Sequence, residues 1–112
     1  MAAALLALGS TGCSQDPATN DRLFCEDAPI VTWDNFGAGF VVENCRSCHH
    51  PESEDRQEAP DGVDFVTEDD VFAYQDRVLA RATGPEPTMP PGGGTDGDDR
   101  YQLEVWLRCS DL

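Results

Sequence analysis

The chain has 112 residues, of which 22 are Asp or Glu and seven are Lys or Arg, so its formal net charge is −15 at pH 7. This length suits one small domain with a thin core, of the kind that disulfides, metals or cofactors often stabilise. The acidity argues against a nucleic-acid partner, which would need clustered basic side chains, and favours solubility or a basic protein partner.

The first 13 residues, MAAALLALGSTGC, predict a secretory signal peptide. Residues 2–8 form an apolar run that is too short to span a bilayer, and residues 9–12 are small or polar. The Gly12–Cys13 ending resembles a bacterial lipobox, in which the cysteine is acylated and becomes the mature N-terminus; the alternative is an apolar leader with a chance cysteine. We therefore expect an exported, periplasmic protein that is anchored to the membrane by lipidation of Cys13.

A polar stretch without hydrophobic periodicity, residues 14–23, follows this leader and is predicted to be a flexible tether. The domain proper then covers residues 24–112. Its first predicted helix spans residues 34–44, with Thr32 as the candidate N-cap. This helix runs directly into Cys45.

Two further helices are predicted downstream. One opens at Thr67, with Asp70 as its capping-box partner, and the other begins at Thr95 or Asp96. The stretches between the helices are rich in charge, proline and glycine: residues 50–62 and 85–94. Because no convincing pair of amphipathic strands is present, the predicted fold class is all-α, with about three helices and long loops.

The stretch Cys45-Arg46-Ser47-Cys48-His49 carries the main chemical signal of the sequence. Two cysteines two residues apart, with a histidine after the second, match the pattern for covalent attachment of haem c. The two thiols add across the vinyl groups on one porphyrin edge, and the two-residue spacer matches the separation of those groups. The histidine then lies under the iron and ligates it. We therefore predict one haem c bound through Cys45 and Cys48, with His49 as an axial ligand.

Three other uses of this motif remain open. A zinc site would need about four ligands, and no second cysteine pair stands at the required spacing, although His50 could supplement His49. A thioredoxin-like dithiol would need a βαβ context, whereas the neighbouring pattern is helical. A local Cys45–Cys48 disulfide would leave His49 unexplained. We expect His50 to be solvated, because a residue adjacent to His49 cannot easily reach the opposite haem face.

A second axial ligand is predicted at Met89, the only methionine besides the initiator. It stands in an irregular loop directly before Pro90 and Pro91, which stiffen the backbone around it. Its thioether is therefore free to point inward rather than lie on a helix face. Thioether ligation favours ferrous iron and raises the reduction potential, as an electron carrier requires.

The remaining cysteines, Cys25 and Cys109, stand near the two ends of the domain. If Cys13 is lipidated and the motif cysteines act together, these two are left to pair in an oxidising compartment. Such a bridge closes a long loop and would stabilise the fold by roughly 4 kcal/mol in the chain-entropy model. The alternative is two unpaired thiols.

These features make residues 24–112 resemble a class I c-type cytochrome domain, and in particular the short bacterial cytochrome c lipoproteins of the myxobacterial type. The motif residues and Met89 carry the resemblance. Class I cytochromes also cross-pack their first and last helices through a glycine and an aromatic side chain. Gly37 fits the glycine position, and Leu103 with Trp106 fits the last helix. The resemblance implies a cytochrome c-like fold built around one covalently bound haem.

The segment Arg56–Pro60, with the sequence RQEAP, also resembles these lipoproteins. No chemistry is assigned to it beyond building the loop beside the haem.

The sequence therefore predicts an exported, monomeric electron carrier rather than an enzyme. It would pass single electrons between redox partner proteins through a haem ligated by His49 and Met89, and a basic partner would suit its charge. One alternative is a haem-based peroxidase, or a gas or redox sensor, with a labile Met89. Another is a haem-free surface lipoprotein stapled by disulfides.

Overall fold

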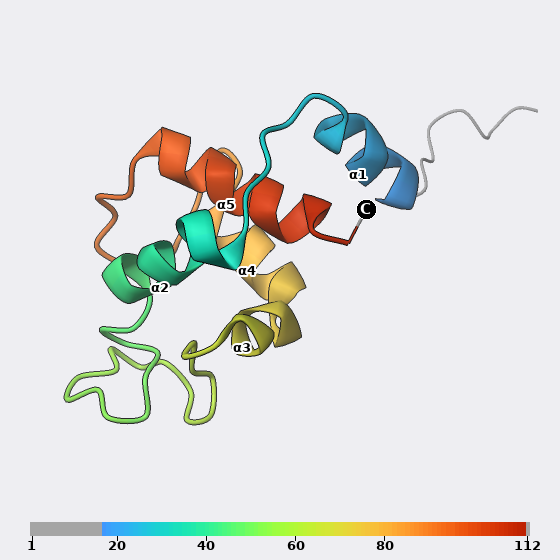
Figure 1. Ribbon diagram of the computed structural model, residues 1–112. Helices are drawn as coiled ribbons and strands as arrows, with labels where there is room; N and C mark the ends of the chain where they lie inside the picture. Colours follow the sequence, from blue (N-terminus) through green and yellow to red (C-terminus); the bar gives the residue numbers. More distant parts are fainter. Residues whose placement is uncertain (1–16, 112) are drawn as a thin grey trace, which may run out of the picture.

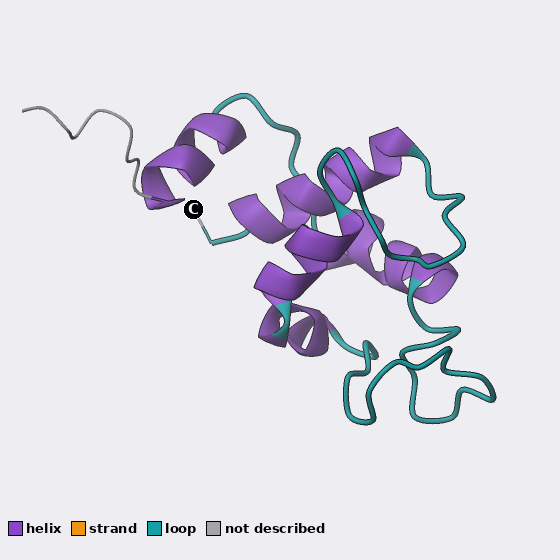
Figure 2. Ribbon diagram, turned by 180° about the vertical axis from the view of Figure 1, so that it is seen from behind, coloured by secondary structure: helices purple, strands orange, loops and turns teal. Residues whose placement is uncertain are grey.

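The computed structural model describes residues 17–111, so the predicted leader, Cys13 and the first residues of the predicted tether lie outside the described residues. Within this range the chain is helical and contains no β-strand (Figures 1 and 2), which agrees with the predicted all-α class. In chain order the elements are α1 (Pro17–Cys25), the π-helical turn η2 (Trp33–Gly37), α2 (Ala38–Asn44), α3 (Glu68–Ala73), α4 (Gln75–Ala82) and α5 (Gly97–Cys109). None of the helices in this range has the length and apolar character that crossing a lipid bilayer requires.

Helix α5 forms the centre of the core. Its apolar side chains are almost completely removed from water, and the indole of Trp106 is 0% exposed. The others are Leu103, Val105 and Leu107. Elements η2 and α4 pack against α5, so burial of one helix face organises most of the helical part of the chain (Figure 1).

The contact between η2 and α5 depends on a residue without a side chain. A Cβ built on Gly37 would lie only 2.8 Å from Cζ2 of Trp106. The indole also packs against two other aromatic rings, with centroid separations of 5.9 Å to Trp33 and 5.4 Å to Phe72. The predicted cross-packing of Gly37 against Trp106 is thus confirmed, because the glycine lets the indole approach the backbone.

Two capping boxes define where helical structure begins. Asn35 N–H donates to Oγ1 of Thr32 at 3.0 Å, and Thr32 N–H donates back to Oδ1 of Asn35 at 2.8 Å. Thr67 and Asp70 make the same reciprocal pair at the start of α3, with bonds of 3.2 and 3.0 Å. At the start of α5 the N-cap is Asp96, whose carboxylate accepts from the first turn. All three positions agree with the N-caps predicted from the sequence.

The second predicted helix is interrupted at Tyr74. Its backbone angles, φ −116° and ψ 26°, end α3, and α4 begins at the next residue. The Tyr74 ring packs edge-on against Phe65, with the centroids 6.0 Å apart. The periodic apolar positions before and after the bend, Val71 and Ala82, are nevertheless both buried. The sequence pattern therefore identified the core face of this segment but not its division into two helices.

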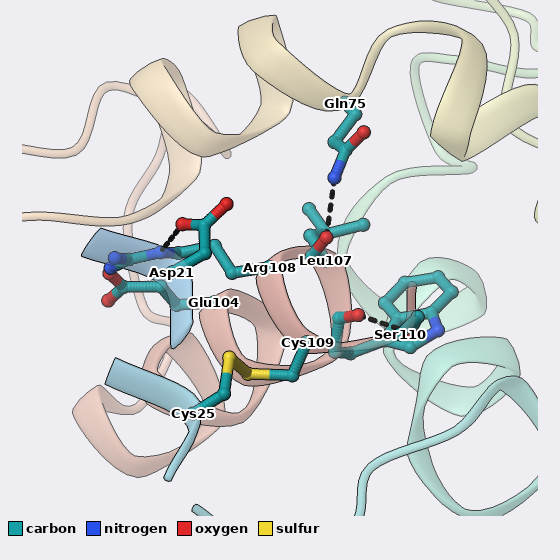
Figure 3. The surroundings of a disulfide bond; sticks show 9 residues. Asp21, Cys25, Gln75, Glu104, Leu107, Arg108, Cys109 and Ser110 are labelled. Atoms are coloured by element: carbon teal, nitrogen blue, oxygen red, sulfur yellow. Dashed lines mark hydrogen bonds and ion pairs between the residues drawn. A yellow bond between two sulfur atoms is a disulfide. The ribbon is translucent and has the colours of Figure 1, made fainter. Parts of the chain in front are cut away.

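The prediction that residues 14–23 form a flexible tether is wrong for the part that the structure describes. Residues from Pro17 onward belong to α1, which packs against α5 (Figure 3). Nε of Arg108 donates to Asp21 at 2.9 Å, and the Arg108 guanidinium lies 3.9 Å above the centre of the Phe24 ring. The residues that hold α1 in place belong to α5. Because α1 itself lacks a clear apolar stripe, its own sequence did not predict a packed helix.

A disulfide joins the end of α1 to the end of α5 (Figure 3). The Cα atoms of Cys25 and Cys109 are 5.7 Å apart, within the range that a disulfide bridges without backbone movement. The structure thus brings together the two cysteines that the sequence analysis paired.

Candidate functional site

The C-x-x-C-H motif lies where α2 ends. Cys45 is the C-cap of α2, and its N–H donates to the carbonyl of Val41 at 2.9 Å. The backbone then continues in one further turn, in which the N–H groups of Cys48 and His49 both donate to the carbonyl of Cys45, at 3.2 and 2.8 Å. Residues three and four positions apart on such a turn share a face. The turn therefore places the two thiols and the imidazole on one side of the backbone.

These three side chains line a cleft of about 330 Å³, within the usual range for small-molecule sites. Its walls come from the end of α2 and the motif, from Gln57, and from the loop at residues 89–94. Met89 is one of the lining residues. The four side chains predicted to hold a haem therefore share one cavity, although they come from segments about 40 residues apart in the sequence: Cys45, Cys48, His49 and Met89.

Both motif cysteines are free thiols, with Cys45 half-buried and Cys48 buried. Burial, and to a smaller extent the adjacent Cys48, raises the pKa of Cys45 to about 12. Redox-active dithiols have lowered pKa values because the thiolate is the reacting form. The environment of Cys45 therefore does not favour the thioredoxin-like alternative, and no bond joins the two sulfurs as the local-disulfide alternative would require.

The imidazole of His49 is fixed by a backbone carbonyl. Its Nδ1 lies 2.8 Å from the carbonyl oxygen of Val63. Because a carbonyl can only accept, Nδ1 carries the proton, and Nε2 keeps a free lone pair. The ring also packs against Phe65 with a centroid separation of 4.8 Å. This arrangement is typical of metal-binding histidines, in which one nitrogen is oriented by an outer partner and the other is available.

The second histidine of the motif region is placed elsewhere. His50 does not line the cleft; its Nδ1 accepts from the backbone N–H of Glu52 at 3.1 Å. The side chain is half-buried and lines a separate hollow, whose other charged residues are Arg46, Glu52, Glu54 and Asp55. His50 and His49 therefore point to different surroundings, although they are adjacent in the sequence.

The backbone at Met89 is held by hydrogen bonds from two helices. The N–H groups of Thr88 and Met89 both donate to the carbonyl of Arg81, at 2.7 and 2.9 Å. From the first turn of α5, Nη1 of Arg100 donates to the carbonyls of Met89 and Ala82, each at 2.8 Å. These bonds join the end of α4, the loop and the start of α5. Arg100 was not singled out in the sequence analysis, because nothing in its local pattern indicates that it reaches backbone carbonyls 11 and 18 residues away.

Two further side chains beside the cleft also escaped the sequence analysis as positioning groups. Arg46, between the two motif cysteines, donates to the carbonyls of Phe65 and Val66 at 3.2 and 2.6 Å. Asn44, at the end of α2, accepts from Oγ1 of Thr95 at 2.9 Å. These bonds tie the motif to the segment that follows the acidic loop and to the segment before α5.

Within residues 17–111, no three His, Cys, Asp or Glu side chains converge closely enough to hold a metal ion by themselves. A larger hollow, about 870 Å³, lies beside the disulfide. It is lined by neither His nor Met, and its only two sulfur atoms, those of Cys25 and Cys109, are bonded to each other. The smaller cleft at the motif is therefore the candidate site, because it contains the ligating side chains.

No family model, curated protein or solved structure matches this chain. The function is therefore inferred from the residues of the chain and their arrangement.

Proposed function

We propose that this chain is an exported monohaem c-type cytochrome, with a cytochrome c-like fold, that carries single electrons between redox partner proteins. The observation that carries the proposal is the shared cleft, which is lined by both motif thiols, by His49 and by Met89. In a haem the macrocycle already supplies most of the iron's ligands, so the protein has to add only axial groups and, in c-type cytochromes, two thiols for covalent attachment. The donor set of this cleft fits those requirements.

Each side chain of the cleft has a distinct role in this proposal. Cys45 and Cys48 would form the two thioether bonds, and His49 would offer Nε2 to the iron while the carbonyl of Val63 holds its Nδ1–H. Met89 offers a thioether on a loop whose backbone is fixed by Arg81 and Arg100. A haem bound there supplies an iron centre that accepts and releases one electron.

Features outside the cleft support the same assignment. The close packing of Gly37 on Trp106 supports the proposal, because the resemblance to class I cytochromes implies a glycine–aromatic contact between helices. The Cys25–Cys109 pairing suits an oxidising compartment, which is where an exported protein would be found. Lipidation of Cys13 and attachment to a membrane remain part of the proposal.

The charge distribution beside the cleft favours a basic redox partner. Residues 50–66, which follow the motif directly, carry six acidic side chains against one basic side chain, Arg56. The acidic residues are Glu52, Glu54, Asp55, Glu58, Asp61 and Asp64. Such a surface would speed encounters with a positively charged partner through long-range attraction.

Covalent haem content tests the proposal directly. The protein would be produced together with a bacterial haem ligation system, and haem that resists extraction by acid acetone would be measured by the pyridine haemochrome assay. We expect one haem per chain in the wild type and essentially none in the Cys45→Ala/Cys48→Ala double variant, because the thioether bonds are then impossible.

The matched control is Ser47→Ala, which changes an exposed residue between the two cysteines and should leave the haem content unchanged. A wild-type protein without covalent haem, or a double variant that retains it, would contradict the proposal.

A further inference from the structure

The RQEAP segment forms a tight loop around the side chain of its first residue. The Arg56 side chain is only 18% exposed. Its Nη1 donates to the carbonyl of His50 at 2.8 Å and to Oδ1 of Asp64 at 2.7 Å, and its Nη2 donates to the carbonyl of Pro60 at 2.7 Å. A longer bond of 3.3 Å runs from Nε to the carbonyl of Ala59. Charge-assisted hydrogen bonds as short as the three to His50, Asp64 and Pro60 are among the strongest that a side chain makes.

The two bonds of Nη1, one to a backbone carbonyl and one to a side-chain carboxylate, reach the residues that directly follow the two partners of the His49 hydrogen bond. His50 directly follows His49, and Asp64 directly follows Val63, the residue whose carbonyl accepts from the imidazole. One guanidinium nitrogen therefore bridges His50 and Asp64, the residues next to the imidazole donor and its carbonyl acceptor. In addition, Nη2 lies 3.3 Å from the Val63 carbonyl itself, which has a second lone pair to accept it.

The backbone of the loop shows how strongly this arrangement is held. Gln57 and Glu58 have φ values of 49° and 71°, in the left-handed region that residues with a side chain seldom adopt. Such a conformation is energetically unfavourable, and it persists where surrounding contacts determine the conformation. The bonds of Arg56 to His50, Ala59 and Pro60 close the loop around these two residues.

We propose that Arg56 is a positioning residue for the iron-binding imidazole: its guanidinium holds the carbonyl of Val63 against Nδ1–H of His49 and thereby fixes the tautomer and the rotation of the ring. This inference rests on the proposed function only in taking His49 as the iron ligand. A lysine would keep the charge, but its single ammonium group cannot reach the same set of acceptors, which a planar guanidinium with five N–H donors does.

The rotation of an axial imidazole can be read in the ferric, haem-loaded protein. The ring plane sets the direction of the magnetic anisotropy of low-spin Fe(III), and with it the spread of the haem methyl resonances in proton NMR. We would record these spectra, the electron paramagnetic resonance spectrum and the reduction potential of the wild type, Arg56→Lys and Arg56→Gln. The control is the same pair of substitutions at Arg77, an exposed residue of α4.

We expect the methyl resonances to shift and broaden in both Arg56 variants, while both Arg77 variants keep the wild-type pattern. The potential should fall further in Arg56→Gln than in Arg56→Lys, because only the glutamine also removes the positive charge beside the carbonyl that orients His49. Wild-type methyl resonances in both Arg56 variants, even with a lowered melting temperature, would reduce Arg56 to a structural role and overturn the inference.

A second variant covers the case in which Arg56 is needed for maturation of the protein. If the Arg56 variants fail to mature, Asp64→Asn provides a milder test, because it weakens the 2.7 Å bond on Nη1 but retains the guanidinium. Its methyl resonances should move in the same direction by a smaller amount, and unchanged resonances would overturn the inference.

A wild-type protein without covalent haem would overturn the proposed function and this inference together, whereas a haem-loaded protein insensitive to Arg56 overturns the inference alone.

Discussion

The helical part of the molecule and the loop at residues 45–66 are held together by different forces. In the helical part, side chains such as Leu103 and Trp106 are almost fully removed from water and pack against neighbouring helices. In the loop, only Cys48 and Phe65 are buried, and its conformation depends on hydrogen bonds from Arg46 and Arg56 to backbone carbonyls. Burial is non-directional, whereas each of these hydrogen bonds fixes a particular distance and angle.

This contrast explains why the candidate cleft lies at the edge of the helical core rather than inside it. The outer partner of a metal-binding imidazole is a hydrogen-bond acceptor such as a free backbone carbonyl, and a regular helix keeps its interior carbonyls for its own hydrogen bonds. The irregular loop offers such a carbonyl at Val63. Substitutions in the loop should therefore alter the properties of the site, while substitutions in the core should alter stability.

The largest effect is expected at Met89, on the second loop of the cleft. In Met89→Ala the haem should stay attached, but the iron should become five-coordinate or water-ligated. The reduction potential should then fall by on the order of hundreds of millivolts, within the range that axial ligands span. Loss of the absorbance band near 695 nm, which reports Met–Fe(III) ligation, together with a redox titration, measures both changes.

The control for this variant is His50→Ala, which should change neither signal, because His50 does not line the cleft. A wild-type protein that lacks the 695 nm band and has a high-spin spectrum would favour the peroxidase or sensor alternative, in which Met89 is labile.

A smaller effect, on stability alone, is expected from the disulfide in the helical part. The Cys25→Ser/Cys109→Ser variant opens a loop closed across a sequence separation of 84, and the chain-entropy model gives a loss of about 4–5 kcal/mol in the free energy of unfolding. Denaturant unfolding measures this loss, and the potential should stay the same because neither sulfur lines the cleft. Peptide mapping without reductant should recover the linked pair, and finding both cysteines alkylatable would refute the pairing.

Gly37→Ala tests whether the core depends on the close approach of Trp106. The backbone of Gly37 is helical, with φ −58° and ψ −46°, so alanine alone would favour the helix by up to about 1 kcal/mol. The new Cβ would, however, lie 2.8 Å from the indole, and overpacking of this kind costs about 1–3 kcal/mol. We therefore expect a net loss of stability of up to about 2 kcal/mol by denaturant unfolding.

The neighbouring Gly39→Ala is the matched control. Gly39 is exposed in α2, and no atom lies within 4 Å of a Cβ built there, so this substitution should be neutral or slightly stabilising. Equal effects of the two substitutions would show that the indole contact does not matter.

The smallest effect concerns the charge of the loop. If the acidic side chains of residues 50–66 attract a basic partner, the rate of electron transfer to a basic redox protein should fall as salt rises, because the Debye length at physiological salt is about 8 Å. Transfer to an acidic redox protein should be slower and should rise with salt. Stopped-flow rates that stay flat with the basic partner would limit the acidic loop to a role in solubility.

Local sequence signals predicted the helical part well. The capping pairs at Thr32 and Thr67 and the apolar stripe of α5 depend on residues three or four positions apart, so they can be recognised without knowing the fold. The same holds for the C-x-x-C-H motif. Helix α1 was missed because its partners, Arg108 and Cys109, lie more than 80 residues away.

The positioning groups of the site could not be predicted for a related reason. Each of these interactions uses a backbone carbonyl: that of Val63 accepts from His49, and Arg56 and Arg100 donate to carbonyls of other residues. A carbonyl is present at every residue. Nothing in the sequence therefore distinguishes the carbonyl that orients His49 from any other. Met89 could be proposed from the sequence because it is the only methionine besides the initiator.

The joining of α1 to the end of α5 has a practical consequence for attaching this protein to a surface. Both views place this junction at one end of the molecule, and the loops of the cleft at the other (Figures 1 and 2). A tag or fused domain joined to α1 or to the residues after α5 would therefore leave the cleft uncovered. On an electrode, immobilisation through that junction would turn the cleft toward the solution. Capture through residues 89–94 would instead turn the cleft toward the electrode surface. Comparing the voltammetry of the two orientations would show through which side of the protein the electron leaves.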